Sequence, residues 1–186
     1  STLWCAMPVR RAPTVLKRDQ QLHEELIPLL VDRLGVKSYL EFGIYQNNTI
    51  KPVVARCKGL AIHGVDINEP HERIPGVFYH IMTTSEFISA YAARYAPYDL
   101  VFIDADHCLE SALSDFGGIV RHVSPEGLVL LHDTNPATVA DTVPTACGDS
   151  WRLNSFFRDC EYEYVTLPYH PGLTIYRKRE RYEPAP

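Results

Sequence analysis

The sequence lacks several features that would place it in a broad class at once. It has no apolar run long enough to span a bilayer, and its N-terminus has no apolar segment of the secretory type. Its five cysteines are an odd number and show no CxxC spacing, which is typical of reduced thiols rather than of zinc sites. Internal repeats, low-complexity tracts and interdomain linkers are also missing. We therefore expect a cytoplasmic protein with no contact with membranes.

An excess of basic residues is absent as well. The chain has 18 Lys and Arg against 23 Asp and Glu, a formal net charge of -5. A nucleic-acid-binding surface needs a clustered basic footprint, so no nucleic-acid partner is expected. The short basic stretch at residues 177–181 is interrupted by an acid and is expected to be a solvated chain end.

What is present is the composition of one globular domain. The 186 residues are 46% hydrophobic and 22% charged, which allows one real core but not two. Residues 1–18 contain prolines and basic residues without a sustained period, so we expect an irregular arm there. Residues 19–180 should form the domain, and residues 181–186 a tail.

Helical and strand patterns alternate along the domain, which favours an α/β sheet. Apolar runs that predict strands end near residues 42, 66, 81, 104 and 133. The run at residues 99–104 is apolar on both faces, as a central parallel strand requires. The first helix should begin at Asp19 and be kinked or restarted at Pro28. The residues predicted to face the sheet from this helix are Leu22, Leu26, Leu29, Leu30 and Leu34.

The last third of the chain changes character. Residues 125–127 predict a turn before a strand at 128–133, and residues 134–149 predict a long polar loop. Residues 151–160 should form a short helix with Leu153, Phe156 and Phe157 inward. Strand patterns at residues 163–167 and 173–176 flank Pro168-Tyr169-His170-Pro171-Gly172, which indicates a hairpin.

Residues 39–49 carry the first sign of function. They predict a buried strand with Glu41 near its carboxyl end, a bend at Gly43 and a polar turn that opens a helix. In an open α/β sheet, ligands bind beyond the carboxyl ends of the strands. An ordinary strand-turn-helix connection explains this stretch equally well. Asp66, which ends the next apolar run about 20 residues later, tips the balance, because a carboxylate at this spacing binds the ribose hydroxyls of an adenosine.

The motifs Glu41-Phe42-Gly43, Val65-Asp66, Ile103-Asp104-Ala105-Asp106-His107 and Leu131-His132-Asp133 occur in this order along the chain. This set resembles the class I S-adenosylmethionine-dependent methyltransferases, and in particular their small O-methyltransferase-like members, over roughly residues 36–178. The resemblance implies a doubly wound, Rossmann-like fold with a mostly parallel seven-stranded sheet of order 3-2-1-4-5-7-6, closed by an antiparallel C-terminal hairpin. The chain departs from the family at residues 45–48, where most members carry at least one more glycine.

The resemblance also implies a cofactor site for S-adenosylmethionine. Glu41 would approach the cationic methionine end, Asp66 would hold the ribose, and Thr84 and Ser85 would lie near the adenine. Backbone N–H groups could instead satisfy the two acids, and a capping box from Thr83 to Glu86 explains much of the third turn. The cofactor-binding residues expected from the resemblance are Glu41, Gly43, Tyr45, Asp66, Ile67, Thr84, Ser85 and Asp104.

Asp104 and Asp133 end strands that should be neighbours. Two carboxylates this close repel each other, and a divalent cation is one way to stabilise them. Catechol-type members hold magnesium with an Asp after the fourth strand and an Asp-Asn pair after the fifth. Here Thr134 replaces that Asn, although Asp106 or Asn135 could supply the third ligand. The alternative is that Asp104 and Asp133 only cap loop amides.

Histidine offers a mechanism without metal. His107 follows Asp104 closely and could act as the general base on an acceptor hydroxyl, because its ordinary pKa lies near working pH. We therefore expect His107 and Asp104 to be catalytic, and His132 to be a packed, hydrogen-bonded histidine.

The expected function is methyl transfer from S-adenosylmethionine to an oxygen of a small molecule. One alternative is a nicotinamide-dependent oxidoreductase, which Asp66 would also suit, although the GxGxxG run is missing and the terminal hairpin is out of place. Another is a non-catalytic binding module with a methyltransferase-like fold. The acceptor is not readable from residues 1–18 or 134–150, where the family carries its specificity. Oligomeric state stays open, although a short N-terminal arm can complete a neighbour's site.

Overall fold

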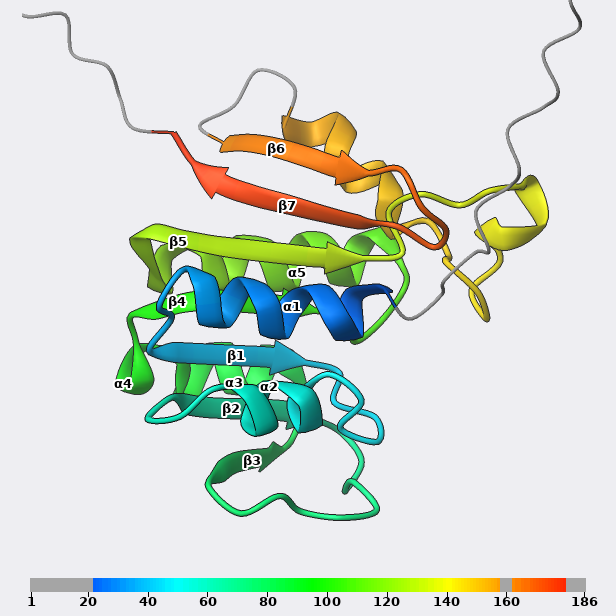
Figure 1. The fold of residues 1–186 in the computed structure, drawn as a ribbon. Helices are drawn as coiled ribbons and strands as arrows, with labels where there is room; N and C mark the ends of the chain where they lie inside the picture. Colours follow the sequence, from blue (N-terminus) through cyan, green and yellow to red (C-terminus); the bar gives the residue numbers. More distant parts are fainter. Residues whose placement is uncertain (1–21, 158–161, 180–186) are drawn as a thin grey trace, which may run out of the picture.

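The computed structural model describes residues 22–157 and 162–179. The predicted arm, the predicted tail and the first residues of the predicted first helix lie outside this part of the chain. The described residues form a seven-stranded sheet of order β3-β2-β1-β4-β5-β7-β6, which confirms the expected order (Figure 1). The strands are β1 (Ser38–Phe42), β2 (Ala61–Asp66), β3 (Val77–Ile81), β4 (Tyr98–Ile103), β5 (Val123–His132), β6 (Tyr162–Leu167) and β7 (Leu173–Lys178).

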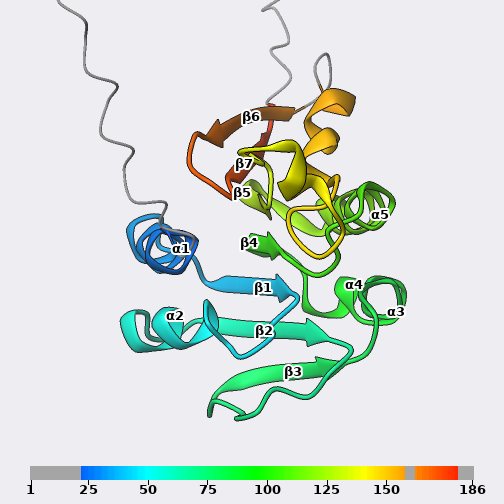
Figure 2. The same cartoon turned by 90° about the vertical axis from the view of Figure 1, so that its right-hand side faces the viewer.

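Helices cover both faces of this sheet. One face carries α1 (Leu22–Arg33) and α2 (Ile50–Arg56), and the opposite face carries α3 (Thr84–Ala90), α4 (Ala92–Tyr95) and α5 (Leu109–Ile119), as Figure 2 shows. Short 3-10 helices lie at η1 (Val120–His122), η2 (Val139–Thr142) and η3 (Ser150–Phe157). None of the helices in the described part of the chain has the length and apolar character of a membrane span.

The sheet is parallel from β3 to β5 and antiparallel beyond. β1 pairs in parallel with both β2 and β4, and β4 pairs in parallel with β5. β7 runs antiparallel to β5 and to β6, so the last two strands form the predicted hairpin. Helices supply the connections from β1 to β2, from β3 to β4 and from β4 to β5, and a loop at residues 67–76 joins β2 to β3. The hairpin needs only the short loop at residues 168–172.

The central strands separate two hydrophobic cores. Residues alternate along β1 and β4 between the two faces of the sheet. Leu40, Phe42 and Val101 belong to the core under α3, α4 and α5, and Tyr39 and Phe102 belong to the core under α1 and α2. All five side chains are fully buried. A strand buried on both faces reads as a continuous apolar run, which is why the sequence identified β4.

The first helix differs in part from the prediction. It continues through Pro28 and is not restarted there, and its buried residues are His23, Ile27, Pro28 and Val31. Of the predicted leucine face, Leu26 and Leu30 pack against the core, whereas Leu29 and Leu34 are 38% and 58% exposed. Apolar residues occur almost all round this helix, so the period alone could not select the buried face.

Two further boundaries differ from the prediction. Residues 125–127 belong to β5, where the pairing with β4 shifts register between Tyr98 and Leu100, rather than to a separate turn. The helix predicted from residue 151 is the 3-10 helix η3, in which Phe156 is 53% exposed rather than inward. Residues 158–160 of that prediction lie outside the described residues.

Two histidines form a pair between the edge strand β3 and its neighbour β2. His63 on β2 and His80 on β3 are joined by a hydrogen bond of 3.1 Å between Nδ1 of the first and Nε2 of the second. The ring of Tyr95 lies 4.5 Å from that of His63, and the ring of Phe87 lies 4.8 Å from that of His80. Burial, and then the neighbouring His80, lower the pKa of His63 to about 4, and burial also lowers the pKa of His80.

This pair predicts acid sensitivity. The pKa of His63 is lower in the folded chain than its ordinary 6.5, so its contribution to stability is present above pH 6.5 and is lost as the pH falls towards 4. Between pH 7 and pH 4.5 the wild type should lose about 2 kcal/mol more of its free energy of unfolding than the His63→Gln variant does. Urea unfolding at both pH values measures this difference. His71→Gln, which removes an exposed histidine, should behave as the wild type does. Equal losses in wild type and His63→Gln would contradict the prediction.

Candidate active site

The ends of four parallel strands bring the predicted site residues together. Glu41 lies within β1, Asp66 ends β2, Asp104 follows β4 and Asp133 follows β5. Because these strands are parallel neighbours, their carboxyl ends meet at one edge of the sheet, as Figure 1 shows for the paired central strands.

Gly43 lies where the backbone after β1 approaches the backbone after β4 most closely. Its φ is +85°, and a Cβ added there would lie 2.7 Å from Cα of Ala105 and still closer to the carbonyl oxygen of Asp104. The N–H of Gly43 donates to Val65, and the N–H of Asp104 donates to the carbonyl oxygen of Phe42. Only glycine combines this backbone conformation with so close an approach.

Asn47 lies in the following turn, residues 45–48, where the resemblance implied a further glycine. It has a φ of +62° and is fully buried, and the exposed Tyr45 has a φ of +42°. The Oδ1 atom of Asn47 accepts a hydrogen bond of 2.9 Å from the hydroxyl of Tyr79, and Nδ2 donates to the carbonyl oxygen of Glu72. Asparagine tolerates the left-handed region better than other non-glycine residues, so the sequence did contain a signal for this turn.

Asp66 holds the same turn by its carboxylate. Oδ2 accepts the N–H groups of Ile44 and Tyr45 at 3.0 and 3.1 Å, and Oδ1 accepts the N–H of Asn68 at 2.8 Å. A carboxylate can accept about four hydrogen bonds. Asp66 therefore serves the backbone, as the alternative explanation expected, and still keeps acceptor capacity on Oδ1 for a ligand hydroxyl.

A cavity of about 290 Å³ lies beside Gly43 and Asp66. Of the residues predicted to bind cofactor, Gly43, Asp66, Ile67 and Thr84 line it. The predicted capping box from Thr83 to Glu86 is confirmed, and Ser85 is exposed. The full lining among the described residues is Gly43, Val65, Asp66, Ile67, Met82, Thr83, Thr84, Ala105, Asp106, Ser111 and Asp115. It contains three carboxylates and no basic side chain.

Glu41 does not belong to the described lining. It is 2% exposed, and the hydroxyl of Tyr39 donates to its Oε2 at 2.5 Å. Burial raises the pKa of Glu41 well above its usual range. Its place at the methionine end of a cofactor stays a prediction, as does a cofactor contact by Tyr45.

Asp104 and Asp133 lie close together, as the strand order predicted, and two histidines connect them. Nε2 of His107 is 3.2 Å from Asp133 Oδ2 and 4.0 Å from Asp104 Oδ1. On the other side, Nδ1 of His132 is 3.0 Å from Asp104 Oδ1 and 3.5 Å from Asp133 Oδ1. Burial alone lowers the pKa of His132, but the two aspartates outweigh it and raise the pKa to about 10. The imidazolium of His132 thus offsets much of the repulsion between the carboxylates.

The same atoms fit a divalent cation. One ligand atom each from Asp104, His107 and Asp133 lie within 4.8 Å of one another. The other candidates for the third ligand are engaged elsewhere. Asn135 donates through Nδ2 to the carbonyl oxygen of Tyr169, and Asp106 accepts from the Ser111 hydroxyl at 2.8 Å and lines the cavity.

Sequence reasoning missed three residues around this cluster. His23 comes from α1, and its ring lies 4.1 Å from that of His132. Burial, and then the nearby charge of His132, lower the pKa of His23 to about 4. The thiol of the buried Cys147 interacts with Asp133, and Asp115 lines the cavity from α5. The sequence places none of these three near the motifs.

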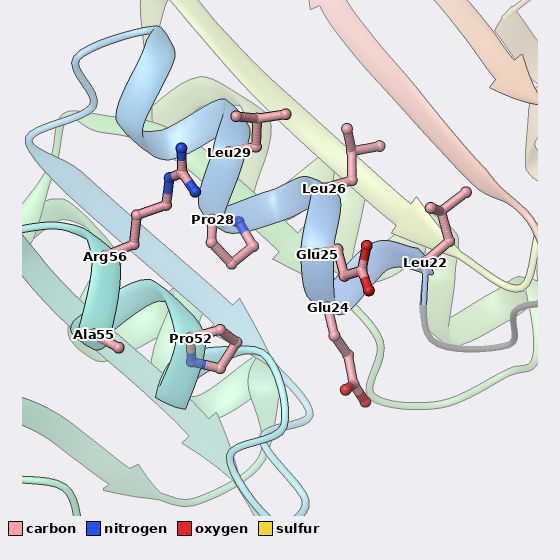
Figure 3. Close-up of a pocket in the computed structure, with 9 residues that line it drawn as sticks. All are labelled: Leu22, Glu24, Glu25, Leu26, Pro28, Leu29, Pro52, Ala55 and Arg56. Atoms are coloured by element: carbon pink, nitrogen blue, oxygen red, sulfur yellow. The ribbon is translucent and has the colours of Figure 1, made fainter.

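A second hollow lies on the outer surface, between α1 and α2 (Figure 3). Its volume is about 680 Å³, and Leu26, Leu29, Pro28 and Pro52 contribute to its walls. Three of the leucines that the sequence assigned to the core, Leu22, Leu26 and Leu29, therefore line this hollow. The motif carboxylates and His107 are not among its lining residues.

The comparisons with known proteins agree with this geometry. A family model described as a methyltransferase domain matches residues 45–134. A Staphylococcus aureus protein provisionally described as a caffeoyl-CoA O-methyltransferase has a solved structure that is 19% identical, covers 84% of this chain and 83% of its own, and gives a TM-score of 0.70. No curated protein matches the chain in sequence.

Two other solved structures contain S-adenosylhomocysteine (SAH). An O-methyltransferase from Bacillus cereus in complex with SAH is 15% identical over 88% of this chain and 84% of its own, with a TM-score of 0.66. The MycE methyltransferase of the mycinamycin biosynthetic pathway, in complex with Mg, SAH and mycinamycin VI, is 19% identical over 87% of this chain, with a TM-score of 0.66. This chain spans only 50% of the MycE chain. At these identities the likenesses establish the fold.

The close contact at Gly43 predicts that alanine has opposite effects on stability at Gly43 and at Gly117. Gly43→Ala should lower the free energy of unfolding by about 3 kcal/mol or more, because the new Cβ meets backbone atoms and the φ is positive. Gly117→Ala in α5 should raise it by about 0.5–1 kcal/mol, because a Cβ there meets nothing and alanine favours the helix. Urea unfolding of both variants measures these effects. A Gly43→Ala variant as stable as wild type would show that the contact is not as close as described.

Proposed function

We propose that this chain is a class I methyltransferase that transfers the methyl group of S-adenosylmethionine to an oxygen atom of a small molecule. We also propose that the described residues act as one domain, within residues 19–180, and that the protein works in the cytoplasm.

The charge of the cavity beside Gly43 carries this proposal. Asp66, Asp106 and Asp115 line it, and no described lining residue is basic. A nicotinamide dinucleotide would bring a diphosphate group, which such a lining would repel. An adenosine carries hydroxyl and amino donors and no phosphate, and the thioether or sulfonium end is neutral or cationic. The lining therefore favours S-adenosylmethionine over the dinucleotide.

The chain's own residues supply the parts that hold such a ligand. Asp66 keeps acceptor capacity on Oδ1 for a ribose hydroxyl, and Gly43 lets the backbone approach the ligand without a side chain. Ile67 and Ala105 lie on the walls, where apolar contact with a purine is favourable. S-adenosylmethionine supplies an electrophilic methyl group, so the remaining task of the protein is to align the acceptor and remove its proton.

His107 is placed to take that proton. Its Nδ1 is hydrogen-bonded to the carbonyl oxygen of Ala146, which leaves Nε2 as the atom that receives a proton. Nε2 lies 3.2 Å from Asp133, so the imidazolium that forms would be stabilised by that carboxylate. In this account His107 acts as the base, the carbonyl oxygen of Ala146 positions its neutral ring, and Asp133 stabilises the imidazolium that forms.

The cation alternative uses the same side chains differently. A divalent cation held by Asp104, His107 and Asp133 would lower the pKa of an acceptor hydroxyl. His132 already compensates both carboxylates, at 3.0 and 3.5 Å, and this favours the metal-free mechanism. The metal remains the second candidate because the three ligand atoms lie within 4.8 Å of one another.

Ligand binding tests the function directly. Isothermal titration calorimetry should show that SAH binds with a dissociation constant in the micromolar range, about -8 kcal/mol. NADH should give no heat of binding at the same concentrations, because of the acidic lining. Binding of NADH without binding of SAH would overturn the proposal in favour of an oxidoreductase. Binding of neither at millimolar ligand would favour the non-catalytic module.

The mechanism predicts a contrast between variants, measured as SAH release with a hydroxyl acceptor found by screening. His107→Ala should lower turnover at least about 100-fold and keep its affinity for SAH, because a general base contributes at least that much. His122→Ala, on the opposite end of the sheet at η1, should keep full turnover. Chelator should have no effect on the wild type.

The metal mechanism predicts a different set of results. Chelator would abolish turnover and magnesium would restore it, and Asp133→Ala would lose turnover while it keeps its affinity for SAH. Full turnover of the chelator-treated wild type would remove the metal from the account, and full turnover of His107→Ala would remove the base.

A further inference from the structure

His107 lies in a short loop whose position must be fixed if the residue is to act as a base. The loop comprises residues 104–108, between the end of β4 and Leu109, the first residue of α5. A base works only when its nitrogen lies within hydrogen-bond reach of the proton that it takes. A segment that follows β5 much later in the chain, at residues 146–150, contacts this loop.

The segment binds His107 through both its main chain and its ring. The carbonyl oxygen of His107 accepts hydrogen bonds of 3.0 Å from the N–H groups of Asp149 and Ser150. The Nδ1–H of the ring donates to the carbonyl oxygen of Ala146. The same short piece of chain therefore fixes the backbone of His107 and the orientation of its imidazole.

Gly148 makes this close approach possible. Its φ is +56°, and an added Cβ would lie 2.9 Å from Cβ of His107 and still closer to the carbonyl oxygen of that residue. A side chain at this position would push the segment away from His107. The contact between residues 146–150 and the loop of His107 thus depends on a glycine.

Residues 146–150 also contact Asp133. The hydroxyl of Ser150 donates to the carbonyl oxygen of Asp133 at 3.4 Å, and the thiol of Cys147 interacts with the Asp133 carboxylate. Oδ2 of Asp133 lies 3.2 Å from Nε2 of His107. The segment is therefore a common support for the base and for the carboxylate that would stabilise its charged form.

Asp149 joins this segment to the start of α5. Its Oδ1 accepts the N–H of Leu109 at 2.7 Å, although the two residues are 40 positions apart in the chain. The first N–H groups of a helix have no partner within the helix. Cys108, the N-cap of α5, offers a thiol that accepts the N–H of Ser111 at 3.5 Å, and a thiol is a weak acceptor. The carboxylate of Asp149 is a stronger acceptor, and the helix N-terminus favours its negative charge.

We propose that Asp149 is a positioning residue for the base. Through the N–H of Leu109 on one side and the carbonyl oxygen of His107 on the other, it ties residues 146–150 to the loop of His107. It thereby keeps Nε2 of His107 at its distance from Asp133. This inference rests on the proposed function. Asp149 acts through His107 rather than on a substrate, and its second oxygen, Oδ2, lies 3.3 Å from Arg152.

Loss of this carboxylate should lower turnover and leave cofactor binding unchanged. Asp149 is not among the described residues that line the cavity beside Gly43, so Asp149→Ala should keep the wild-type dissociation constant for SAH. Its kcat should fall about tenfold or more, because a misplacement of about 1 Å can lower a rate about 100-fold. Asp149→Asn should keep most of the wild-type kcat, since its amide oxygen can still accept the N–H of Leu109.

The ring of His107 gives a second readout that needs no substrate. Because Nδ1–H donates to the carbonyl oxygen of Ala146, the neutral ring carries its proton on Nδ1. NMR correlations between ring protons and ring nitrogens distinguish this tautomer from the Nε2–H form. At about pH 8, above the ordinary pKa of histidine, the wild type and Asp149→Asn should show the Nδ1–H form of His107. Asp149→Ala should show a mixture of the two forms.

The test compares Asp149→Ala, Asp149→Asn and a matched control with the wild type. The control is Glu110→Ala, which removes an exposed acid from the first turn of the same helix. Turnover is measured as SAH release at a temperature where circular dichroism shows each variant to be folded. Glu110→Ala should keep the wild-type kcat and the Nδ1–H form of His107.

A folded Asp149→Ala variant with wild-type kcat and the Nδ1–H form of His107 would overturn the proposal, and would leave Asp149 as a helix cap. Equal losses of kcat in Asp149→Ala and Glu110→Ala would overturn it too, because negative charge at the helix N-terminus would then explain both. So would a loss of kcat in Asp149→Asn, a result that does not depend on whether the alanine variant folds. If the wild type binds no SAH, the proposed function itself is wrong, and the NMR comparison separates that failure from a failure of the contact with Asp149.

Discussion

The contact between Gly43 and the backbone at Asp104 and Ala105 is the constraint on which the site depends. It brings the ends of β1 and β4 so close that a single added carbon atom would lie 2.7 Å from Cα of Ala105. The cavity lies against this contact, with Asp66 on one side and Ala105 on the other. Because Gly43 has no side chain, a ligand at the carboxyl ends of the strands can approach the backbone there closely. The parallel pairing of β1 with β4 holds these two strand ends in register.

The second constraint is electrostatic. Several carboxylates lie at the carboxyl ends of these strands, and different partners offset their negative charges. Backbone N–H groups satisfy Asp66, and the imidazole of His132 lies between Asp104 and Asp133. Asp115 lines the cavity and is buried, and burial is the main cause of its raised pKa. Repulsion among these acids favours ligands that bring donors or positive charge, which is the basis of the proposed function.

The sequence predicted the fold well because the central strands are buried on both faces and end in acids. The apolar run of β4 and the hairpin of β6 and β7 were read from the residues, and the order of the sheet followed from the resemblance to the methyltransferases. Patterns failed where the signal was not local. The apolar residues of α1 occupy nearly its whole circumference, so the buried face, with His23 in it, could not be chosen. Asp115 lies within α5, outside every motif, and no local pattern shows that it lines the cavity. Asn47 was overlooked because a glycine was expected in that turn.

The most direct test of the account is a crystal structure of the protein soaked with SAH. We expect the ligand in the cavity of about 290 Å³. Its ribose hydroxyls should bind Asp66, and the ligand should contact the backbone of Gly43. Electron density for the ligand at another place, such as the hollow between α1 and α2, would contradict the account. An empty cavity at saturating ligand would contradict it as well.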